Sequence, residues 1–136
     1  MMISTRGRYA LRAIVDIAEQ KTGEYVPLKE IAKRQEMSEK YLESILSALT
    51  RAGILAGLRG KGGGDKLAVA PESCTIGRIL KIVEDRTVMV ACLEHNPNRC
   101  TRARECRTLP MWEKLQSTVD AYLESVTIAS LCKPAH

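Results

Sequence analysis

Three cysteines, Cys92, Cys100 and Cys106, lie in a stretch of the sequence that has no regular hydrophobic pattern. Thiolates bind iron–sulfur clusters and zinc, and thiols of low pKa also react with oxidants. Structural zinc sites usually contain close Cys-x-x-Cys pairs, which this stretch lacks, so zinc is the weaker alternative. The spacing alone leaves two interpretations open, an iron–sulfur cluster and three unligated thiols, of which unligated thiols are the simpler.

A cluster held by three cysteines needs a fourth ligand from elsewhere. His95 lies inside the stretch, but a single loop histidine is more often only solvated, and Glu94 and Glu105 are weaker candidates still. Nearby arginines would favour thiolates and offset the negative charge of a cluster. They are Arg99, Arg102, Arg104 and Arg107. Cys74 and Cys132 lie outside the stretch, Cys132 beside an end expected to fray, and we expect neither to take part.

A glycine-rich stretch at residues 59–64, RGKGGG, is the second candidate site. Its glycines would let a tight hairpin approach a partner backbone without Cβ clashes, and its basic residues suit a narrow minor groove. A nucleotide-binding loop is the alternative, but no Gly-Lys-Ser/Thr follows, and Asp65 stands where a dinucleotide-binding motif needs its third glycine. We therefore interpret the stretch as the wing of a DNA-binding domain. The candidate contacts are Arg59, Lys61, Gly62 and Gly63.

Residues 38–52 predict a helix with Ser38 at its N-cap and apolar residues at three- and four-residue intervals. Its other face would meet solvent or a major groove, where Ser38 and Lys40 can contact phosphates or base edges. Glu43 can accept from cytosine N4, and it would act mainly against wrong sites because a carboxylate near phosphates is costly. A solvated face is the alternative for the helix alone, and the neighbouring glycine-rich stretch favours DNA.

Hydrophobic spacing and capping residues predict the elements that position these groups. We expect a first helix capped at residues 4–5 and ending before Thr22, a second after Pro27, a turn at 35–37, a third helix over 38–52, strands at 54–58 and 66–69, a helix after Thr75, an irregular loop over 91–108 and a last helix from about 110 to 126. This order predicts a mainly α fold with a small β-hairpin, a winged helix-turn-helix followed by a long helix. Residues 1–70 would form the DNA-binding domain, and 71–136 would form a linker helix, the cysteine loop (91–108) and a dimerisation helix.

The last predicted helix carries an apolar stripe too broad for the surface of a monomer. Trp112 and Tyr122 are natural anchors for a partner, and the small N-terminal domain offers limited surface for the alternative, packing within its own chain. We expect a twofold dimer that matches a palindromic operator. The expected contacts are Trp112, Leu115, Val119, Tyr122, Leu123 and Val126.

The charge of the chain also favours duplex DNA. The net charge is +5, and residues 1–66 hold twelve Lys and Arg against eight Asp and Glu, which fits a polyanionic partner. With no Phe, one Trp and four Tyr, the chain has little aromatic surface for stacking on single strands.

Other features of the sequence predict a cytoplasmic protein that is not an enzyme. We find no apolar run that could span a membrane and no secretory leader, and the five cysteines of a protein in a reducing compartment are not expected to form disulfides. A redox enzyme would need a catalytic base near the cysteines, a cofactor fold and a pocket, for which the sequence gives little sign beyond His95.

Several motifs together resemble those of the bacterial regulators typified by IscR, NsrR and CymR. They are residues 3–11 (ISTRGRYAL), 28–32 (LKEIA), 38–43 (SEKYLE), 52–53 (AG), 59–64 (RGKGGG), 75–79 (TIGRI), 111–115 (MWEKL) and 125–128 (SVTI). The resemblance covers nearly the whole chain and implies a homodimeric winged-helix transcription factor, more commonly a repressor. It also implies that Ser38, Tyr41, Glu43 and Ser44 lie on the recognition helix, Arg59 on the wing, and Arg6 and Arg8 on a DNA-facing N-terminal segment. Asp65 departs from the family, which usually has an aromatic residue after these glycines.

The resemblance further implies a cofactor. IscR-like and NsrR-like members have a cysteine trio in this loop and bind a 2Fe–2S or 4Fe–4S cluster, whereas CymR-like members lack the trio. The chain therefore resembles the cluster binders, with 2Fe–2S favoured, 4Fe–4S as the alternative, and Cys92, Cys100 and Cys106 as ligands. IscR-like proteins have a histidine where this chain has Leu109, and NsrR-like proteins an acidic residue where it has Arg8, so the fourth ligand is unassigned. A cluster-free, thiol-sensing regulator that still binds DNA is the alternative function.

Overall fold

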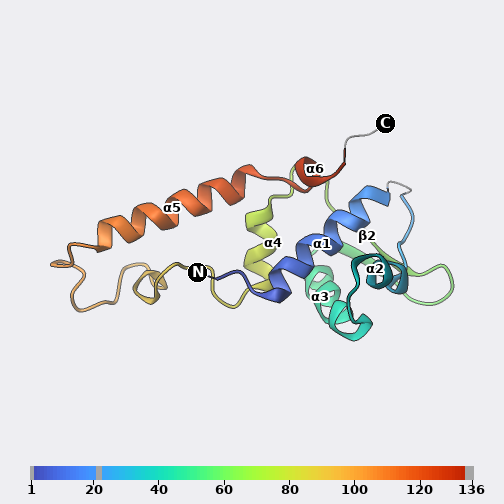
Figure 1. Ribbon diagram of the computed structural model, residues 1–136, viewed down its shortest axis with the longest axis horizontal. Coiled ribbons are helices and arrows are strands. Elements are labelled where there is room, and N and C mark those ends of the chain that lie inside the picture. The colour runs from blue at the N-terminus through green and yellow to red at the C-terminus, as the bar shows by residue number, and fades with distance from the viewer. Residues whose placement is uncertain (1, 21–22, 134–136) are drawn as a thin grey trace.

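The computed structural model describes residues 2–20 and 23–133. Its elements in chain order are α1 (Thr5–Gln20), α2 (Leu28–Gln35), α3 (Glu39–Arg51), β1 (Leu55–Leu58), β2 (Gly64–Leu67), α4 (Ile76–Val83), the 3-10 turn η1 (Ala91–Leu93), α5 (Leu109–Ser125) and α6 (Ile128–Leu131). They divide into two regions. Residues 2–20, 23–84 and 126–133 form the body, and residues 85–125 form the arm, which extends away from the body in Figure 1.

The predicted first helix is confirmed as α1. Its start is fixed by Ser4, whose Oγ accepts a hydrogen bond from the backbone N–H of Gly7 at 3.1 Å. Ala10, Ala13 and Ile14 recur at helical spacing and are fully buried, so one face of α1 lies against the core. The helix ends at Gln20, and Thr22, before which its end was expected, lies outside the described residues.

The helix-turn-helix follows the capping signals. Glu36 closes α2 in a left-handed conformation with φ of 54°. Ser38 then caps α3, because its Oγ accepts a hydrogen bond from the backbone N–H of Tyr41 at 3.3 Å. Four apolar residues of α3 are buried in the core, which makes α3 the amphipathic helix that the spacing predicted. They are Leu42, Ile45, Leu46 and Leu49.

The predicted hairpin is present, but the second strand was placed two residues too late, at 66–69 instead of 64–67. β1 and β2 are antiparallel, from Leu55 opposite Leu67 to Leu58 opposite Gly64. The shift follows from a tertiary contact, since Asp65 exchanges two backbone hydrogen bonds with Val26, at 2.8 and 2.9 Å. Gly64 has φ of 150° beside the Val26 carbonyl, which a Cβ would overlap, so glycine is required there.

The chain returns to the body through α6, which the sequence analysis missed. Ile128 is fully buried, and its backbone N–H donates to the Cys74 carbonyl at 3.0 Å. A helix of four residues is too short to give a periodic hydrophobic signal. Cys132 is half-buried against the core, and the chain end beside it that was expected to fray lies outside the described residues.

The arm packs loosely. All the buried hydrophobic residues of the described ranges belong to the body, and neither α5 nor residues 85–108 contribute any. Gln116 fastens the outgoing chain to α5, because its Nε2 donates to the Thr87 carbonyl at 3.0 Å and its Oε1 accepts from the Met89 N–H at 2.5 Å. The cysteine loop is irregular as predicted, apart from the turn η1.

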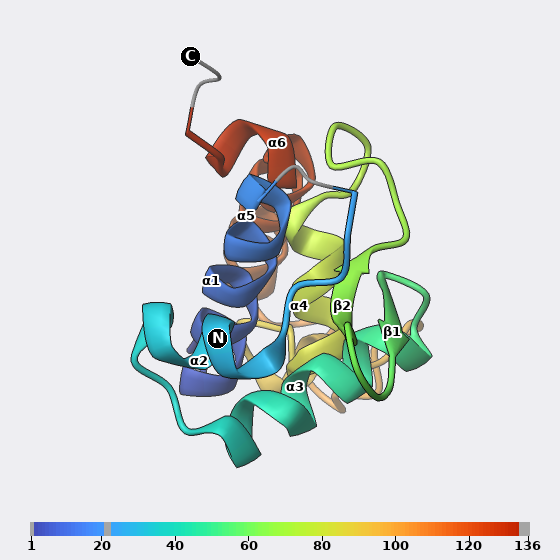
Figure 2. The same ribbon diagram turned by 90° about the vertical axis from the view of Figure 1, so that its right-hand side faces the viewer.

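The predicted fold class, mainly α with one small hairpin, is confirmed for the part of the chain described. In Figure 2 α1 passes through the centre of the body, with α3 below it and the hairpin at its side. Across the described residues, none of the helices combines the length and the apolar character that crossing a membrane requires.

Candidate nucleic-acid interface and cysteine loop

The predicted reading face of α3 is exposed. Its residues are Glu39, Lys40, Glu43, Ser44 and Ser47. The N-cap Ser38 is exposed too, although its Oγ already accepts the Tyr41 N–H. Since the apolar face of α3 lies in the core, this polar face is free to enter a groove that is wide enough for a helix.

The first turn of α1 meets this face. Arg6 Nη1 donates to Ser44 Oγ at 3.1 Å, which brings together two residues predicted to contact DNA from elements far apart in the sequence. Arg8 is exposed and donates instead within its own helix, to Thr5 Oγ1 at 3.3 Å.

Tyr41 lies at the border between this face and the core. Its ring is half-buried and meets the ring of Tyr9 edge to face, with centroids 5.8 Å apart and an interplanar angle of 71°. The Arg12 guanidinium covers the Tyr9 ring at 5.2 Å and also donates to Gln35 on α2, through Nε to Oε1 at 3.3 Å and through Nη2 to the carbonyl. The sequence analysis missed Arg12, for which an arginine three residues after Tyr9 on a helix was the available signal.

A groove of about 570 Å³ separates α3 from the wing. It is lined by Leu28, Glu43, Leu46, Ser47, Thr50, Arg51, Gly57, Arg59 and Asp65. Charges of both signs therefore face one space, with Arg51 and Arg59 opposed by Glu43 and Asp65. Burial raises the pKa of the Asp65 carboxyl above its ordinary value. The groove thus has a half-buried acidic residue at the position where the sequence resemblance leads us to expect an aromatic one.

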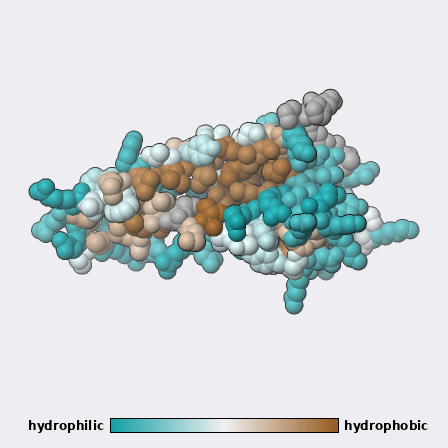
Figure 3. Space-filling view, in the orientation of Figure 1, coloured by the Kyte–Doolittle hydropathy of each residue, from teal (hydrophilic) through white to brown (hydrophobic). Residues whose placement is uncertain are grey.

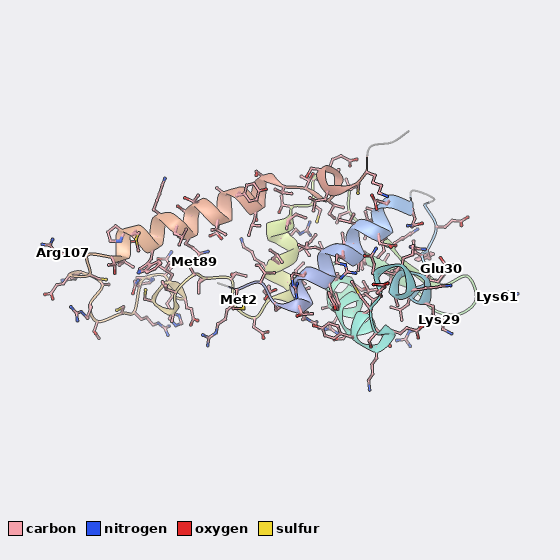
Figure 4. All side chains as sticks on the ribbon, in the orientation of Figure 1. Met2, Lys29, Glu30, Lys61, Met89 and Arg107 are labelled. Carbon is pink, nitrogen blue, oxygen red and sulfur yellow. The ribbon has the colours of Figure 1, made fainter. Side chains whose placement is uncertain are left out.

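The wing tip carries the remaining predicted contacts. Figure 4 shows Lys61 at the end of the hairpin, remote from Arg107 in the cysteine loop. Gly62 has φ of 78° with open space where a side chain would stand. Gly63 is packed within the hairpin, since a Cβ there would overlap the Leu58 carbonyl. The glycines are therefore needed to form the hairpin turn itself, and they also leave room for the backbone of a partner to come close.

A buried charge that sequence reasoning missed joins α1 to α2. Asp16 is 4% exposed and accepts from Arg34 Nη2 at 2.7 Å, Arg34 Nε at 2.9 Å and Gln35 Nε2 at 2.9 Å. Burial by itself would raise the pKa of Asp16, but these hydrogen bonds and the charge of Arg34 outweigh burial and lower it. The signal was an aspartate on the apolar face of α1, a position that requires a partner.

All three thiols of the cysteine loop are free, with Cys100 exposed and Cys92 and Cys106 half-buried. A hydrogen bond with Thr108, whose Oγ1 lies 3.3 Å from Sγ, lowers the pKa of Cys106, and the charge of Arg102 adds to this. In the described ranges no three His, Cys, Asp or Glu side chains are gathered closely enough to hold a metal ion. The donors fit a thiolate-bound cluster chemically, and the loop would have to draw them together.

Three residues of the loop are the candidates for a fourth ligand. His95 and Glu94 line one hollow of about 330 Å³ together with Asp85 and Arg86. Glu94 is engaged in an ion pair with Arg86 at 3.2 Å, and Glu105 is exposed. His95 is exposed as well, so the structure leaves the fourth position unassigned.

The predicted dimer residues on α5 fall into two groups. Tyr122 is 67% exposed, Leu115 38% and the neighbouring Met111 53%, while Trp112 and Val119 are half-buried. Leu123, near the end of α5, and Val126, just beyond it, pack against the core of their own protomer. Figure 3 shows an apolar band that continues over this side of α5 and α4.

Known proteins of similar sequence and structure have been compared with this chain, and they agree with the fold described above. Residues 3–134 match the model of the Rrf2 family, described as iron-dependent transcriptional regulators. The chain is 32% identical to the HTH-type transcriptional regulator IscR of Aliivibrio salmonicida over 131 residues, which cover 96% of this chain and 77% of that protein. It is also similar to the structure of CymR, the global cysteine regulator of B. subtilis, with a TM-score of 0.79 and 31% identity over 96% of this chain and 95% of that one. The structure of T. potens IscR gives a TM-score of 0.74 and 31% identity over 96% and 85% of the two chains.

Proposed function

The chain belongs to the Rrf2 family and is a DNA-binding transcriptional regulator, and from this premise we propose that it is a homodimeric cytoplasmic repressor controlled by an iron–sulfur cluster in its cysteine loop. Its relatives are regulators, which confirms the expectation that the protein is not an enzyme. The observation that carries the proposal is the arm. Its helix α5 buries no residue fully in its own protomer, and it begins three residues after Cys106.

The DNA contacts are proposed on the exposed face of α3, the wing and the start of α1. Lys40, Ser44 and Arg59 are exposed on this side of the body, with Arg6 held against Ser44. A helix in the major groove beside a basic hairpin at the flanking minor groove is the geometry by which winged helices bind duplex DNA. Glu43 and Asp65 in the groove between them add repulsion toward misplaced phosphates, which favours selectivity over affinity.

The dimer is proposed through α5. A helix of 17 residues that leaves Met111, Leu115 and Tyr122 exposed has an apolar face that no described residue of its own chain covers. A second copy is the occupant that fits, because twofold pairing along α5 would place two recognition helices on successive major grooves of a palindrome, roughly 34 Å apart. We propose Trp112 and Val119 as further contacts, with Leu123 and Val126 at the border with the core.

The cluster is proposed at Cys92, Cys100 and Cys106, with 2Fe–2S favoured. All three thiols are free, the lowered pKa of Cys106 favours the thiolate that a ligand must be, and arginines on the loop would offset added negative charge. A bound cluster would supply redox chemistry at the arm. Ligation would hold the three cysteines of the loop close together. The two ends of the arm, where it meets the body, would then shift as the loop closes around the cluster.

The experiment is an anaerobic absorption spectrum of freshly purified protein with iron and sulfide assays, followed by selection of bound duplexes from a random library. We expect visible absorption with matching iron and sulfide, and a palindromic consensus. Cys92→Ala should remove the colour and leave the fold intact, whereas Cys132→Ala, which removes a thiol outside the loop, should keep the colour. A coloured, stable Cys92→Ala protein would refute the ligand assignment.

Thiol sensing without a cluster is the second candidate, and the free thiols with a lowered pKa at Cys106 favour it. The similar CymR structure is described as that of a global cysteine regulator. A protein that binds a palindrome but stays colourless after anaerobic reconstitution would support this candidate over the cluster.

A further inference from the structure

Glu84, the C-cap residue that follows α4, completes the cap of α1. One carboxylate oxygen, Oε1, accepts from the backbone N–H of Ser4 at 3.0 Å and from Ser4 Oγ at 2.8 Å, and that hydroxyl in turn accepts from the Gly7 N–H. A negative charge at a helix N-terminus is stabilised by the unpaired N–H groups and the helix dipole. Glu84 therefore fixes the first turn of a helix 80 residues earlier in the chain.

Gly7 is the position that admits this contact. It is buried, and a Cβ there would overlap Glu84 Oε1. Glycine in a helix is otherwise unfavourable by roughly 1 kcal/mol relative to alanine. The approach of the carboxylate gives the physical reason for glycine at this position.

The same arrangement is repeated between α5 and α4. Glu124, in the last turn of α5, accepts from Thr75 Oγ1 at 3.1 Å, and Thr75 caps α4 by accepting the Arg78 N–H at 3.1 Å. Gly77 lies under this carboxylate, since a Cβ there would overlap Glu124 Oε1. Two carboxylates thus connect α5 to α4 and α4 to α1, each over a buried glycine.

The connection continues to the reading face. The first turn of α1 carries Arg6, which donates to Ser44 on α3. Glu84 is also the last residue before the arm, and Glu124 the last residue but one within it. The two glutamates therefore lie where the arm leaves and rejoins the body, and each contacts the capping residue of a helix.

We propose that Glu84 and Glu124 are positioning residues for DNA binding, which set the first turn of α1, and with it Arg6, according to the arrangement of the arm. The proposal rests on the proposed function as a DNA-binding regulator. A merely structural pair of caps would stabilise the fold without selective influence on operator affinity. The two roles differ in what a mild substitution does to a folded protein.

The first test compares Glu84→Gln with Asp85→Asn. Each removes one negative charge from adjacent positions, but Asp85 is exposed and, in the described part of the chain, its side chain makes no hydrogen bond or ion pair. We expect Glu84→Gln to weaken binding of a selected duplex about fivefold or more, within the range typical of coupling between sites, and Asp85→Asn to leave it unchanged. Amide exchange at Gly7 and Arg8 should quicken only in Glu84→Gln.

Gly7→Ala is a second variant for the role of Glu84, and we expect it to disturb the contact without destabilising the fold. The added methyl displaces the flexible end of Glu84, while alanine favours the helix, so stability should be kept and duplex binding weakened. Equal duplex affinities for Glu84→Gln and Asp85→Asn, or unchanged affinity in Gly7→Ala, would overturn the role of Glu84. Failure of the unsubstituted protein to select any duplex would instead overturn the proposed function.

The second test addresses the contact from α5, with Glu113→Gln as the matched control. Glu113 is exposed on the same helix and, among the residues described, its side chain makes no hydrogen bond or ion pair. Glu124→Gln should weaken duplex binding and quicken exchange at Gly7, to a smaller extent than Glu84→Gln, and Glu113→Gln should do neither. Unchanged affinity and exchange in Glu124→Gln would overturn the α5 part of the proposal.

Discussion

The body and the arm use similar residue types in opposite ways. The body gathers all the fully buried isoleucines, leucines and alanines of the described residues in one core, to which α1, α3, α4 and α6 all contribute. The arm has Met111, Leu115 and Tyr122 at comparable helical spacing and leaves them exposed. The difference shows that an apolar stripe predicts a buried face without telling whether the covering surface lies in the same chain. The body is specified by its own sequence, and the arm is suited to an external partner.

The largest expected contrast concerns thiols. In reduced, cluster-free protein we expect Cys106 in the arm to react with an alkylating agent several thousandfold faster than Cys74 in the body. Cys74 is fully buried and burial raises its pKa, so it reacts only after opening, which costs about 5 kcal/mol or more for a stable domain. Mass spectrometry of quenched samples measures both rates, and comparable rates would mean that the two regions open together.

Removal of apolar side chains should also separate the regions. Leu42→Ala in the body is expected to lower the free energy of unfolding by about 2–5 kcal/mol, because Leu42 is fully buried. Leu115→Ala in the arm should lower the free energy of unfolding of the protomer by less than about 1 kcal/mol, after the contribution of dimerisation, which depends on protein concentration, is subtracted. The same substitution should weaken dimerisation. Denaturation at several protein concentrations with sedimentation equilibrium measures both effects. A large loss of protomer stability in Leu115→Ala would contradict the division.

The buried ion pair gives the body a loss of stability in acid that we do not expect from the arm. Because the pKa of Asp16 is lowered in the folded state, its contribution is present above the ordinary aspartate pKa, about 3.9, and is lost as the pH falls through the folded value. Asp16→Asn should cost about 1–3 kcal/mol at neutral pH and remove this acid-side loss. Denaturation between acid and neutral pH tests it, with exposed Asp85→Asn as control, and an unchanged pH profile in Asp16→Asn would count against the prediction.

The smallest expected effect is a difference in duplex affinity between substitutions of two exposed arginines, one on the wing and one in the arm. Arg59→Ala on the wing is expected to weaken duplex binding by about 1–2 kcal/mol and to reduce the salt dependence by about one ion. Arg104→Ala in the arm should change neither by more than a few tenths of a kcal/mol. Binding titrations at several salt concentrations distinguish them, and equal effects would place the DNA contact elsewhere.

The sequence predicted what depends on local signals. Ser38 and Thr75 marked helix starts correctly, and the α3 stripe identified which face is buried. The sequence-based prediction was wrong where a contact between distant residues sets the structure. One such contact is the pairing of Asp65 with Val26, which shifts the position of β2. The prediction also missed Glu84 and Glu124, because a carboxylate that caps a remote helix has no local pattern. The domain boundary at residue 70 stays a prediction, although α4 and α6 share the core of the body.

Gln116 has a further consequence for the cysteine loop. By holding Thr87 and Met89 against α5, it fixes both ends of the intervening stretch before any ligand arrives. Closing a flexible chain of about 20 residues costs roughly 3 kcal/mol of entropy. Since this closure is part of folding, a ligand that gathers the three thiols would restrict only the interior of an already closed ring, as a macrocyclic chelator binds more tightly than its open-chain counterpart.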